Sequence, residues 1–145
     1  MATMTQATVN SLIPGEIPAR LAARVIDAGV LVAIGAVLGR QIGFSYDWLI
    51  ATASIVLIYF VLMDALLGTT LGKAAMRLQV TSTDSSKPTV KQALLRECFT
   101  LLGAIPFVGP LLAAGAWVWI IVTIRSSPLR QGIHDRWAGT RVVRR

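Results

Sequence analysis

The sequence has few of the residues that build enzyme and metal sites. It contains one cysteine and one histidine among 145 residues, and charged residues make up only 14%. The single Cys98 excludes an internal disulfide, and its apolar neighbours favour a packing role over a nucleophilic one. One histidine, His134, with no second histidine or cysteine nearby, makes a poor metal site. Since no nucleophile–base pair stands out either, we expect no catalysis, no metal and no cofactor.

Acidic residues are also scarce, seven against fourteen lysines and arginines, which gives a net charge of +7. A basic balance can indicate nucleic-acid binding, but neither a basic sheet interleaved with aromatic residues nor a recognition helix is visible, so that function is not expected. The basic residues instead cluster at the edges of long apolar runs, as the positive-inside rule describes. With 54% hydrophobic residues and a mean hydropathy of +0.66, the composition predicts a single-domain membrane protein.

Two long apolar runs predict transmembrane helices at about residues 21–38 and 48–67. The first is a retained anchor rather than a signal peptide, because Asp27 interrupts it and no small-residue cleavage site follows. Its Gly35 and Gly39 have the small-xxx-small spacing that allows close helix approach in lipid. Residues 1–17 are polar and lack a periodic apolar face, which predicts a disordered tail ahead of a single membrane domain over residues 18–145.

A third apolar region, at about residues 94–105 and 110–124, is broken by prolines. If every basic flank is cytoplasmic, this region must enter and return on the same side, which favours a helical hairpin with both chain termini cytoplasmic. A single kinked span, with the basic tail outside, is the alternative. The alternating segment 76–80 can pair with 140–143 as short strands. The predicted fold is thus an all-α membrane protein with two transmembrane helices, this third region and a short cytoplasmic β-pair.

Three ionisable residues stand at the entry of the first span. On a helix, Arg20, Arg24 and Asp27 share one face. A charge inside a span costs roughly 2.5–3.5 kcal/mol near the centre unless it is paired or faces protein. Because a short loop makes the two spans antiparallel, Asp64 near the end of the second returns to the depth of Asp27. We therefore expect Asp27 to meet a basic residue there, either Arg24 or Arg96.

Three motifs in this order resemble those of the RDD family of small bacterial membrane proteins. They are Arg20-x6-Asp27 at the first span, Thr70-Leu71-Gly72-Lys73 after the second, and His134-Asp135-x2-Ala138-Gly139-Thr140 in the tail. The resemblance covers about Pro18 to Val143, which is nearly the whole chain. It implies a multi-pass protein of the bacterial cytoplasmic membrane. Some members of the family are linked to ion transport, and others are domains or partners of larger transport and envelope systems.

The name residues of the family map onto Arg20, Asp27 and Asp135. The sequence departs from the family pattern in two places, with Leu71 where proline is usual and Arg24 where an aromatic residue is frequent. We expect Asp135 to pair with an arginine and so hold the tail against the membrane domain. The predicted polar cluster, gathered at the cytoplasmic side, comprises Arg20, Arg24, Asp27, Asp64, Lys73, Arg96, His134 and Asp135.

The expected function is that of a non-catalytic accessory subunit that docks on a larger membrane transport complex and stabilises or regulates it. A complex that moves lipid or another envelope component is the expected kind. Four or fewer crossings and little soluble mass offer a docking surface more readily than an enclosed pathway. The expected partners are that complex and membrane lipids with anionic headgroups. The alternative is an oligomeric cation or proton transporter in which Asp27 and Asp64 exchange the ion.

Overall fold

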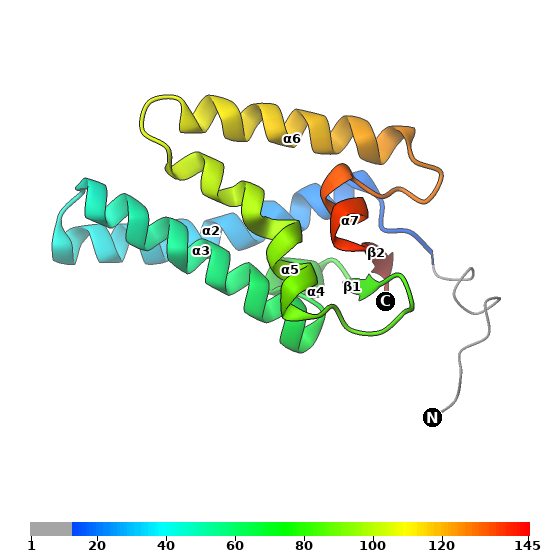
Figure 1. Ribbon diagram of the computed structural model, residues 1–145. Helices are drawn as coiled ribbons and strands as arrows, with labels where there is room; N and C mark the ends of the chain where they lie inside the picture. Colours follow the sequence, from blue (N-terminus) through cyan, green and yellow to red (C-terminus); the bar gives the residue numbers. More distant parts are fainter. Residues whose placement is uncertain (1–12) are drawn as a thin grey trace.

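The computed structural model describes residues 13–145, and within this range three helices are long and apolar enough to cross a membrane. They are α2 (Ile17–Ile42), α3 (Tyr46–Leu67) and α6 (Gly109–Ser126). Figure 1 shows α2 and α3 together where they are connected and diverging toward their other ends, with α6 along the opposite edge of the molecule. The chain is therefore a mostly helical membrane protein, as its composition predicts.

A tight connection joins α2 to α3. Gly43 ends α2 with a φ of 81°, a conformation that glycine adopts without steric cost. The hydroxyl of Ser45 then caps α3 by accepting a hydrogen bond from the Trp48 amide at 3.3 Å. The Trp48 indole donates to the Gly35 carbonyl at 2.7 Å. The two helices are therefore antiparallel and fastened near this connection, which we call the loop end of the molecule.

The two glycines of the small-xxx-small pair are both buried and lie against neighbouring segments of the same chain. A Cβ on Gly35 would lie 3.1 Å from the Thr52 side chain of α3, and one on Gly39 would overlap the Phe44 ring. Their lack of a side chain thus allows α3 and its connecting loop to approach α2 closely.

The third apolar region reverses direction in the segment that contains the two prolines, as the hairpin prediction requires (Figure 1). Its first arm begins as α5 (Val90–Glu97), with a capping box between Thr89 and Gln92. It does not continue as one α-helix to residue 105 but tightens into the 3₁₀-helix η1 (Cys98–Ala104). Cys98, expected to be a packing residue, is exposed in this helix.

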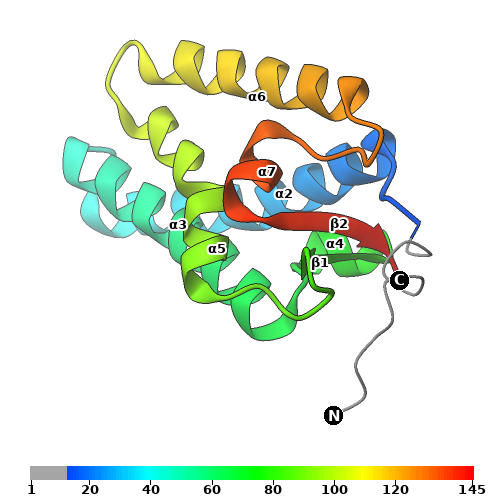
Figure 2. The ribbon, with the colours of Figure 1, turned by 45° about the vertical axis from the view of Figure 1, so that its right-hand side comes forward.

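The predicted strand pair is present. Strand β1 (Leu78–Ser82) pairs antiparallel with β2 (Thr140–Arg144), with Val80 opposite Val142. Figure 2 shows the pair beside the start of α2, next to the short helices α4 (Leu71–Ala75) and α7 (Ile133–Ala138). We call this part of the molecule the sheet end.

The segment just ahead of α2, which the sequence predicts to be disordered, also pairs with β2. Pro14 bridges to Val143, and the Gly15 amide donates to the Val142 carbonyl at 3.0 Å. Of the predicted disordered tail, residues 1–12 lie outside the described residues, whereas residues 13–16 run along the strand. Their backbone groups have partners in β2, and this is why they are held in place.

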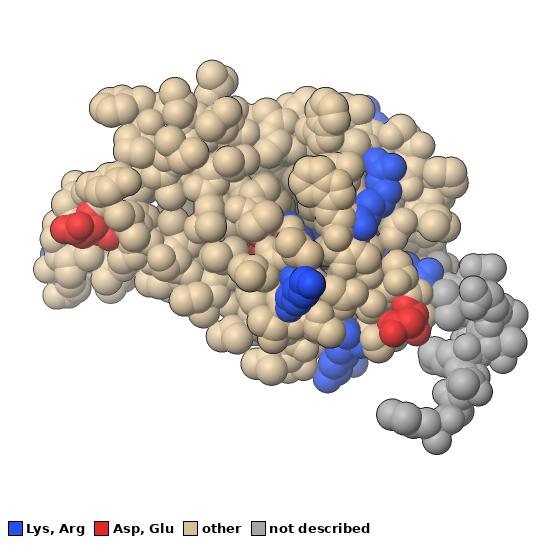
Figure 3. All heavy atoms as spheres, viewed as in Figure 1, with Lys and Arg blue, Asp and Glu red and all other residues tan. Residues whose placement is uncertain are grey.

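Charged side chains are distributed unevenly between the two ends. On the face shown in Figure 3, most lysine and arginine side chains lie toward the sheet end, and an acidic side chain marks the loop end. Arg40 is the one basic residue in the turn that leads to the loop end. The apolar helices between these ends leave large hydrophobic side chains exposed, such as Val32 at 70% and Leu111 at 76%. Such an apolar belt suits contact with lipid.

Candidate functional site

Eight charged residues gather in the interior of the sheet end, and we call them the charge cluster. The four acidic members have no exposed side-chain surface, although acidic residues are only seven in the whole chain. Four basic residues lie among them, so the formal charges balance. The cluster comprises Asp27, Asp64, Glu97, Asp135, Arg20, Arg24, Lys73 and Arg96.

Arg96, in the last turn of α5, lies at the centre of the cluster, and it is only 3% exposed. Its Nε lies 3.7 Å from Asp64 Oδ2 and 3.4 Å from Glu97 Oε1. Its Nη1 lies 3.2 Å from Asp135 Oδ1. One guanidinium therefore neutralises carboxylates from α3, α5 and α7, which joins three separate segments at one point.

Arg20 ties the first helix to the last segment of the chain. Its Nη1 lies 3.1 Å from Asp135 Oδ2, and the same guanidinium donates to the backbone carbonyls of Gly15, Arg130 and Val142 at 3.0, 2.7 and 3.3 Å. The expectation that Asp135 pairs with an arginine and holds the tail is confirmed, with Arg96 as a second partner. An arginine guanidinium carries several N–H donors in a planar fork, so one side chain can bind several acceptors that converge on it, as Arg20 does here.

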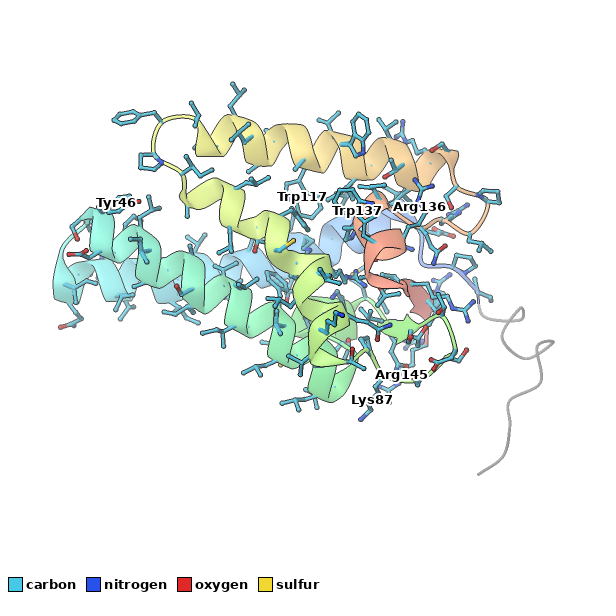
Figure 4. All side chains as sticks on the ribbon, in the orientation of Figure 1. Tyr46, Lys87, Trp117, Arg136, Trp137 and Arg145 are labelled. Atoms are coloured by element: carbon cyan, nitrogen blue, oxygen red, sulfur yellow. The ribbon has the colours of Figure 1, made fainter. Side chains whose placement is uncertain are left out.

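Arg24 pairs with Glu97, an acid that was not among the predicted site residues. Its Nη2 donates to both carboxylate oxygens, at 2.7 and 2.6 Å. The guanidinium also lies over the rings of Phe60, at 4.0 Å, and Trp117, at 5.4 Å. Figure 4 shows Trp117 pointing from α6 toward the interior. Glu97 could have been found by the reasoning used for Asp27, since it too is an acid among apolar positions of a helix.

Lys73 and Asp64 form an ion pair as short as that of Arg24 and Glu97. The Lys73 ammonium donates to both carboxylate oxygens of Asp64, at 2.6 and 2.8 Å, and is almost fully buried. Burial lowers the pKa of Lys73 below its ordinary value, and the Asp64 carboxylate opposes that shift. The pair closes α4 onto the end of α3.

The prediction that Asp27 pairs with Arg24 or Arg96 is wrong: within residues 13–145 its carboxylate has only neutral donors. Tyr59 and Thr70 donate their hydroxyl protons at 2.8 and 2.6 Å, and the Gly72 amide donates at 2.8 Å. The basic residues are held elsewhere, because Arg24 reaches Glu97 and Arg96 lies among three other acids. Three hydrogen bonds satisfy a buried carboxylate without a cation.

This arrangement explains the residues of the Thr70–Lys73 motif. Thr70 caps α4 by accepting from the Lys73 amide at 3.3 Å while it donates to Asp27. Gly72 packs so closely on α2 that a Cβ would overlap the Ala23 carbonyl. Leu71, which stands where the family usually has proline, donates its amide proton to the Tyr59 hydroxyl at 3.2 Å. A proline could not make that bond.

His134 lies at the edge of the cluster and does not add to its charge. Its Nε2 is 3.5 Å from Asp135 Oδ1, and its ring packs edge-on against Phe99 at 5.7 Å. Burial lowers the pKa of His134 to about 4, against the opposing effect of Asp135, so the imidazole is neutral at pH 7. Although burial opposes it, the pairing with Arg96, His134 and Arg20 holds the pKa of Asp135 well below its usual value.

The interior of the cluster leaves little room for a ligand. A cavity of about 40 Å³ is lined by Arg20, Arg24, Asp27, Lys73 and Arg96 together with apolar side chains. That volume has room for two or three water molecules and none for an organic substrate. In the described part of the chain, no group of three histidine, cysteine or acidic side chains is arranged to hold a metal. The geometry is that of a structural junction.

The structure thus brings all eight predicted residues to the sheet end. Seven belong to or touch the ion pairs, and Asp27 joins them through Thr70 and Gly72. The sequence model of the RDD family matches residues 14–139, a range that includes every member of the charge cluster. No curated protein and no solved structure matches the chain.

Proposed function

This chain belongs to the RDD family, and from that premise we propose that it is a non-catalytic accessory subunit of a larger membrane transport complex. In this role it docks on the complex through its apolar helix faces and stabilises or regulates it. A complex that moves a lipid or another envelope component fits a subunit with so little mass outside the apolar helices. The charge cluster would keep the docking faces in one fixed arrangement.

The observation that carries this proposal is that each acid of the charge cluster already has a partner within the chain. Asp64, Glu97 and Asp135 each contact at least one cation, and Asp27 accepts three hydrogen bonds. A carboxylate that exchanges an ion during transport needs access to water and a state in which its partner is released. The cluster has instead a cavity of about 40 Å³, which supports the proposal that these acids are structural and that the protein acts through its outer surface.

The proposed topology follows from the distribution of charge. Lysines and arginines other than Arg40 lie at or near the sheet end, so the positive-inside rule supports placing this end in the cytoplasm of a bacterial inner membrane. The α2–α3 pair would cross twice, and the α5–η1–α6 hairpin would enter and return on the cytoplasmic side. Both chain termini would then be cytoplasmic.

An oligomeric cation or proton transporter is the second candidate, and one observation favours it. In the described residues Asp27 is a buried carboxylate without a cation partner, which is the kind of acid that a transported ion could visit. Against this, one of its three partners is an amide N–H, which cannot coordinate a cation. A proton remains the better cargo for this alternative than a metal cation.

Native purification with mass spectrometry tests the proposal. We expect the tagged full-length protein, extracted in mild detergent, to carry larger membrane subunits in a fixed ratio. Recovery of the protein only as a homo-oligomer would contradict the accessory role. The exposed Asp47 at the loop end provides a matched control, since Asp47→Asn should leave the complex intact whereas Asp27→Asn should reduce the amount of assembled complex.

Reconstitution separates the two candidates. The purified protein alone in vesicles should not dissipate an imposed proton or cation gradient. A flux that is present in the wild-type protein, lost in Asp27→Asn and kept in Asp47→Asn would establish the transporter instead. Thermal unfolding of both variants shows whether a lost flux is only a consequence of lost structure.

A further inference from the structure

An apolar slot opens between α2 and α6, beyond the charge cluster. It has a volume of about 460 Å³ and is lined by one face of α2 together with residues of α3, η1 and α6. On α2 its lining runs from Leu21 to Val32, which spans about 16 Å at ~1.5 Å per residue. Trp117 of α6 and Phe99 of η1 form the opposite wall. The slot therefore extends over about half of a ~30 Å hydrocarbon core, the thickness of one leaflet.

A second hollow, of about 730 Å³, adjoins this slot at the sheet end. It lies between the start of α2 and the end of α6 and is lined by Arg125, Ser127 and Arg130, with Glu16 as its acidic residue. Leu21 lines both hollows, so they meet at this side chain. We call the second hollow the basic mouth. An apolar passage of leaflet length thus leads into a wide opening that carries two arginines, at the level where α6 ends.

We propose that the slot and the basic mouth together form a binding site for one anionic phospholipid of the surrounding bilayer. One acyl chain fills the slot beside Trp117, and the phosphate lies in the mouth between Arg125 and Arg130. This site goes beyond the proposed accessory role, because it assigns a ligand class to a place that the charge cluster does not occupy.

The length and volume of the slot favour a lipid chain as its occupant. The lining extends over three turns of α2, and the volume of about 460 Å³ lies within the ~300–1,000 Å³ typical of small-molecule sites. A flexible hydrocarbon chain fits an apolar space of this length.

The charge of the mouth favours an anionic headgroup. Arg125 and Arg130 are exposed, and in the described part of the chain neither guanidinium takes part in an ion pair. Arg24 also lines the slot, but Glu97 already neutralises the charge of Arg24. The two free arginines exceed the single Glu16, so the mouth is positive. Arginine binds phosphate oxygens well because its donors form a planar fork.

Lipid retention by the purified full-length protein tests the site. After solubilisation from vesicles of equal parts phosphatidylglycerol and phosphatidylcholine, we expect native mass spectrometry to show one retained phospholipid, strongly enriched in phosphatidylglycerol. The double variant Arg125→Ala/Arg130→Ala should lower that enrichment by about thirtyfold, since each basic residue near an anionic surface adds about fivefold. Lys91→Ala/Arg136→Ala, which removes two exposed charges elsewhere at the sheet end, should leave it unchanged.

Filling the slot separates the acyl chain from the headgroup. Ala28 lines the slot, so Ala28→Trp should abolish retention of both lipids. Ala33, another exposed alanine of α2, does not line it, and Ala33→Trp should retain the wild-type amount. Far-ultraviolet circular dichroism and the unfolding temperature of each variant report whether it is folded.

Three results would overturn the site. They are equal retention of both lipids by the wild-type protein, unchanged retention by a folded Ala28→Trp variant, and equal losses in the two charge-pair variants. A second copy in the slot would appear as a dimer that Ala28→Trp dissociates, which also overturns it. These measurements use the isolated protein and need no larger complex, so a protein that purifies without partner subunits but carries the lipid would contradict only the accessory role.

Discussion

The two ends of the α2–α3 pair are held together by different forces. At the sheet end, three acids and four bases form one ion-pair network, and Asp27 lies beside it. At the loop end, Arg40 and Asp47 are exposed, and the helices meet through Trp48, which contacts Phe44 at 5.1 Å and donates to Gly35. In lipid, apolar contact alone gives helices little preference for one arrangement, because lipid tails are equally apolar. The polar sheet end therefore determines how the segments assemble, and the loop end needs only a turn.

The variant that should affect this asymmetry most is Arg96→Met. It keeps much of the side-chain volume but leaves Asp64, Glu97 and Asp135 without their shared cation. Breaking a buried ion network on one side costs about 3–5 kcal/mol, so the unfolding temperature in detergent should fall by about 10 °C or more. Lys91→Met, at an exposed position of the same helix, is the control and should shift it by less than about 2 °C. An equal shift in both variants would show that the cluster does not stabilise the fold.

Mild acid should weaken the sheet end and leave the loop end unaffected. The folded protein holds the pKa of His134 at about 4, below the ordinary value of 6.5. The unfolded chain thus binds a proton that the folded chain does not. The stability that comes from keeping His134 neutral is fully present above pH 6.5. It falls as the pH drops from about 6.5 to about 4, by up to about 1.4 kcal/mol per pH unit. Unfolding temperatures measured across this range provide the test.

The control for this pH effect is His134→Gln, which removes the titrating group. The slope between pH 6.5 and 4 should disappear in this variant. Asp135 does not produce a slope in that window, because its pKa is lowered from 3.8 and its stabilising effect is lost only at lower pH. A slope that persists in His134→Gln would assign the pH dependence to another group.

Asp27→Asn tests the part of the sheet end that relies on neutral donors. The amide keeps the shape of the side chain and one acceptor oxygen, but its NH₂ group replaces an oxygen that accepts the Thr70 proton. The expected loss is about 1–3 kcal/mol, less than for Arg96→Met, because no unpaired buried charge is left behind. Chemical unfolding in mixed micelles measures it. A stabilised variant would show that the carboxylate is kept for a purpose other than packing.

The smallest effect is expected at the loop end. Trp48→Phe removes the hydrogen bond to the Gly35 carbonyl but keeps an aromatic ring beside Phe44. The predicted cost is about 0.5–1.5 kcal/mol, the net value of one hydrogen bond. Comparison with Asp27→Asn under the same conditions measures how unequal the two ends are. A larger loss in Trp48→Phe than in Arg96→Met would reverse the comparison.

The sequence predicts the location of the charge cluster but not all of its pairs. Hydropathy locates the long helices, and the antiparallel relation of two adjacent spans brings Asp64 near the depth of Asp27. The choice of partners depends on side-chain reach. Arg24 pairs with Glu97 rather than with Asp27. Asp27 instead accepts hydrogen bonds from neutral groups, among them the Gly72 amide. Such choices arise from three-dimensional packing, for which the spacing of residues in one helix gives no signal.

Sequence patterns predict secondary structure well where neighbouring residues alone determine the backbone conformation. The pairing of β1 with β2 follows from the alternation of apolar and polar residues. The change from α5 to η1 at Cys98 does not, because the apolar pattern continues without interruption through this point. Residues 13–16 were likewise missed, since their partners lie in β2 at the other end of the sequence.

The contact between Arg20 and Asp135 joins residues that are 115 positions apart. At about 5–20 residues per second, a ribosome needs on the order of ten seconds to make the chain between them. During that time Arg20 enters the bilayer with its helix while its acidic partner does not yet exist. Assembly of the sheet end is therefore a late event in biosynthesis, since a chain that ends before α7 lacks the acid that Arg20 and Arg96 share.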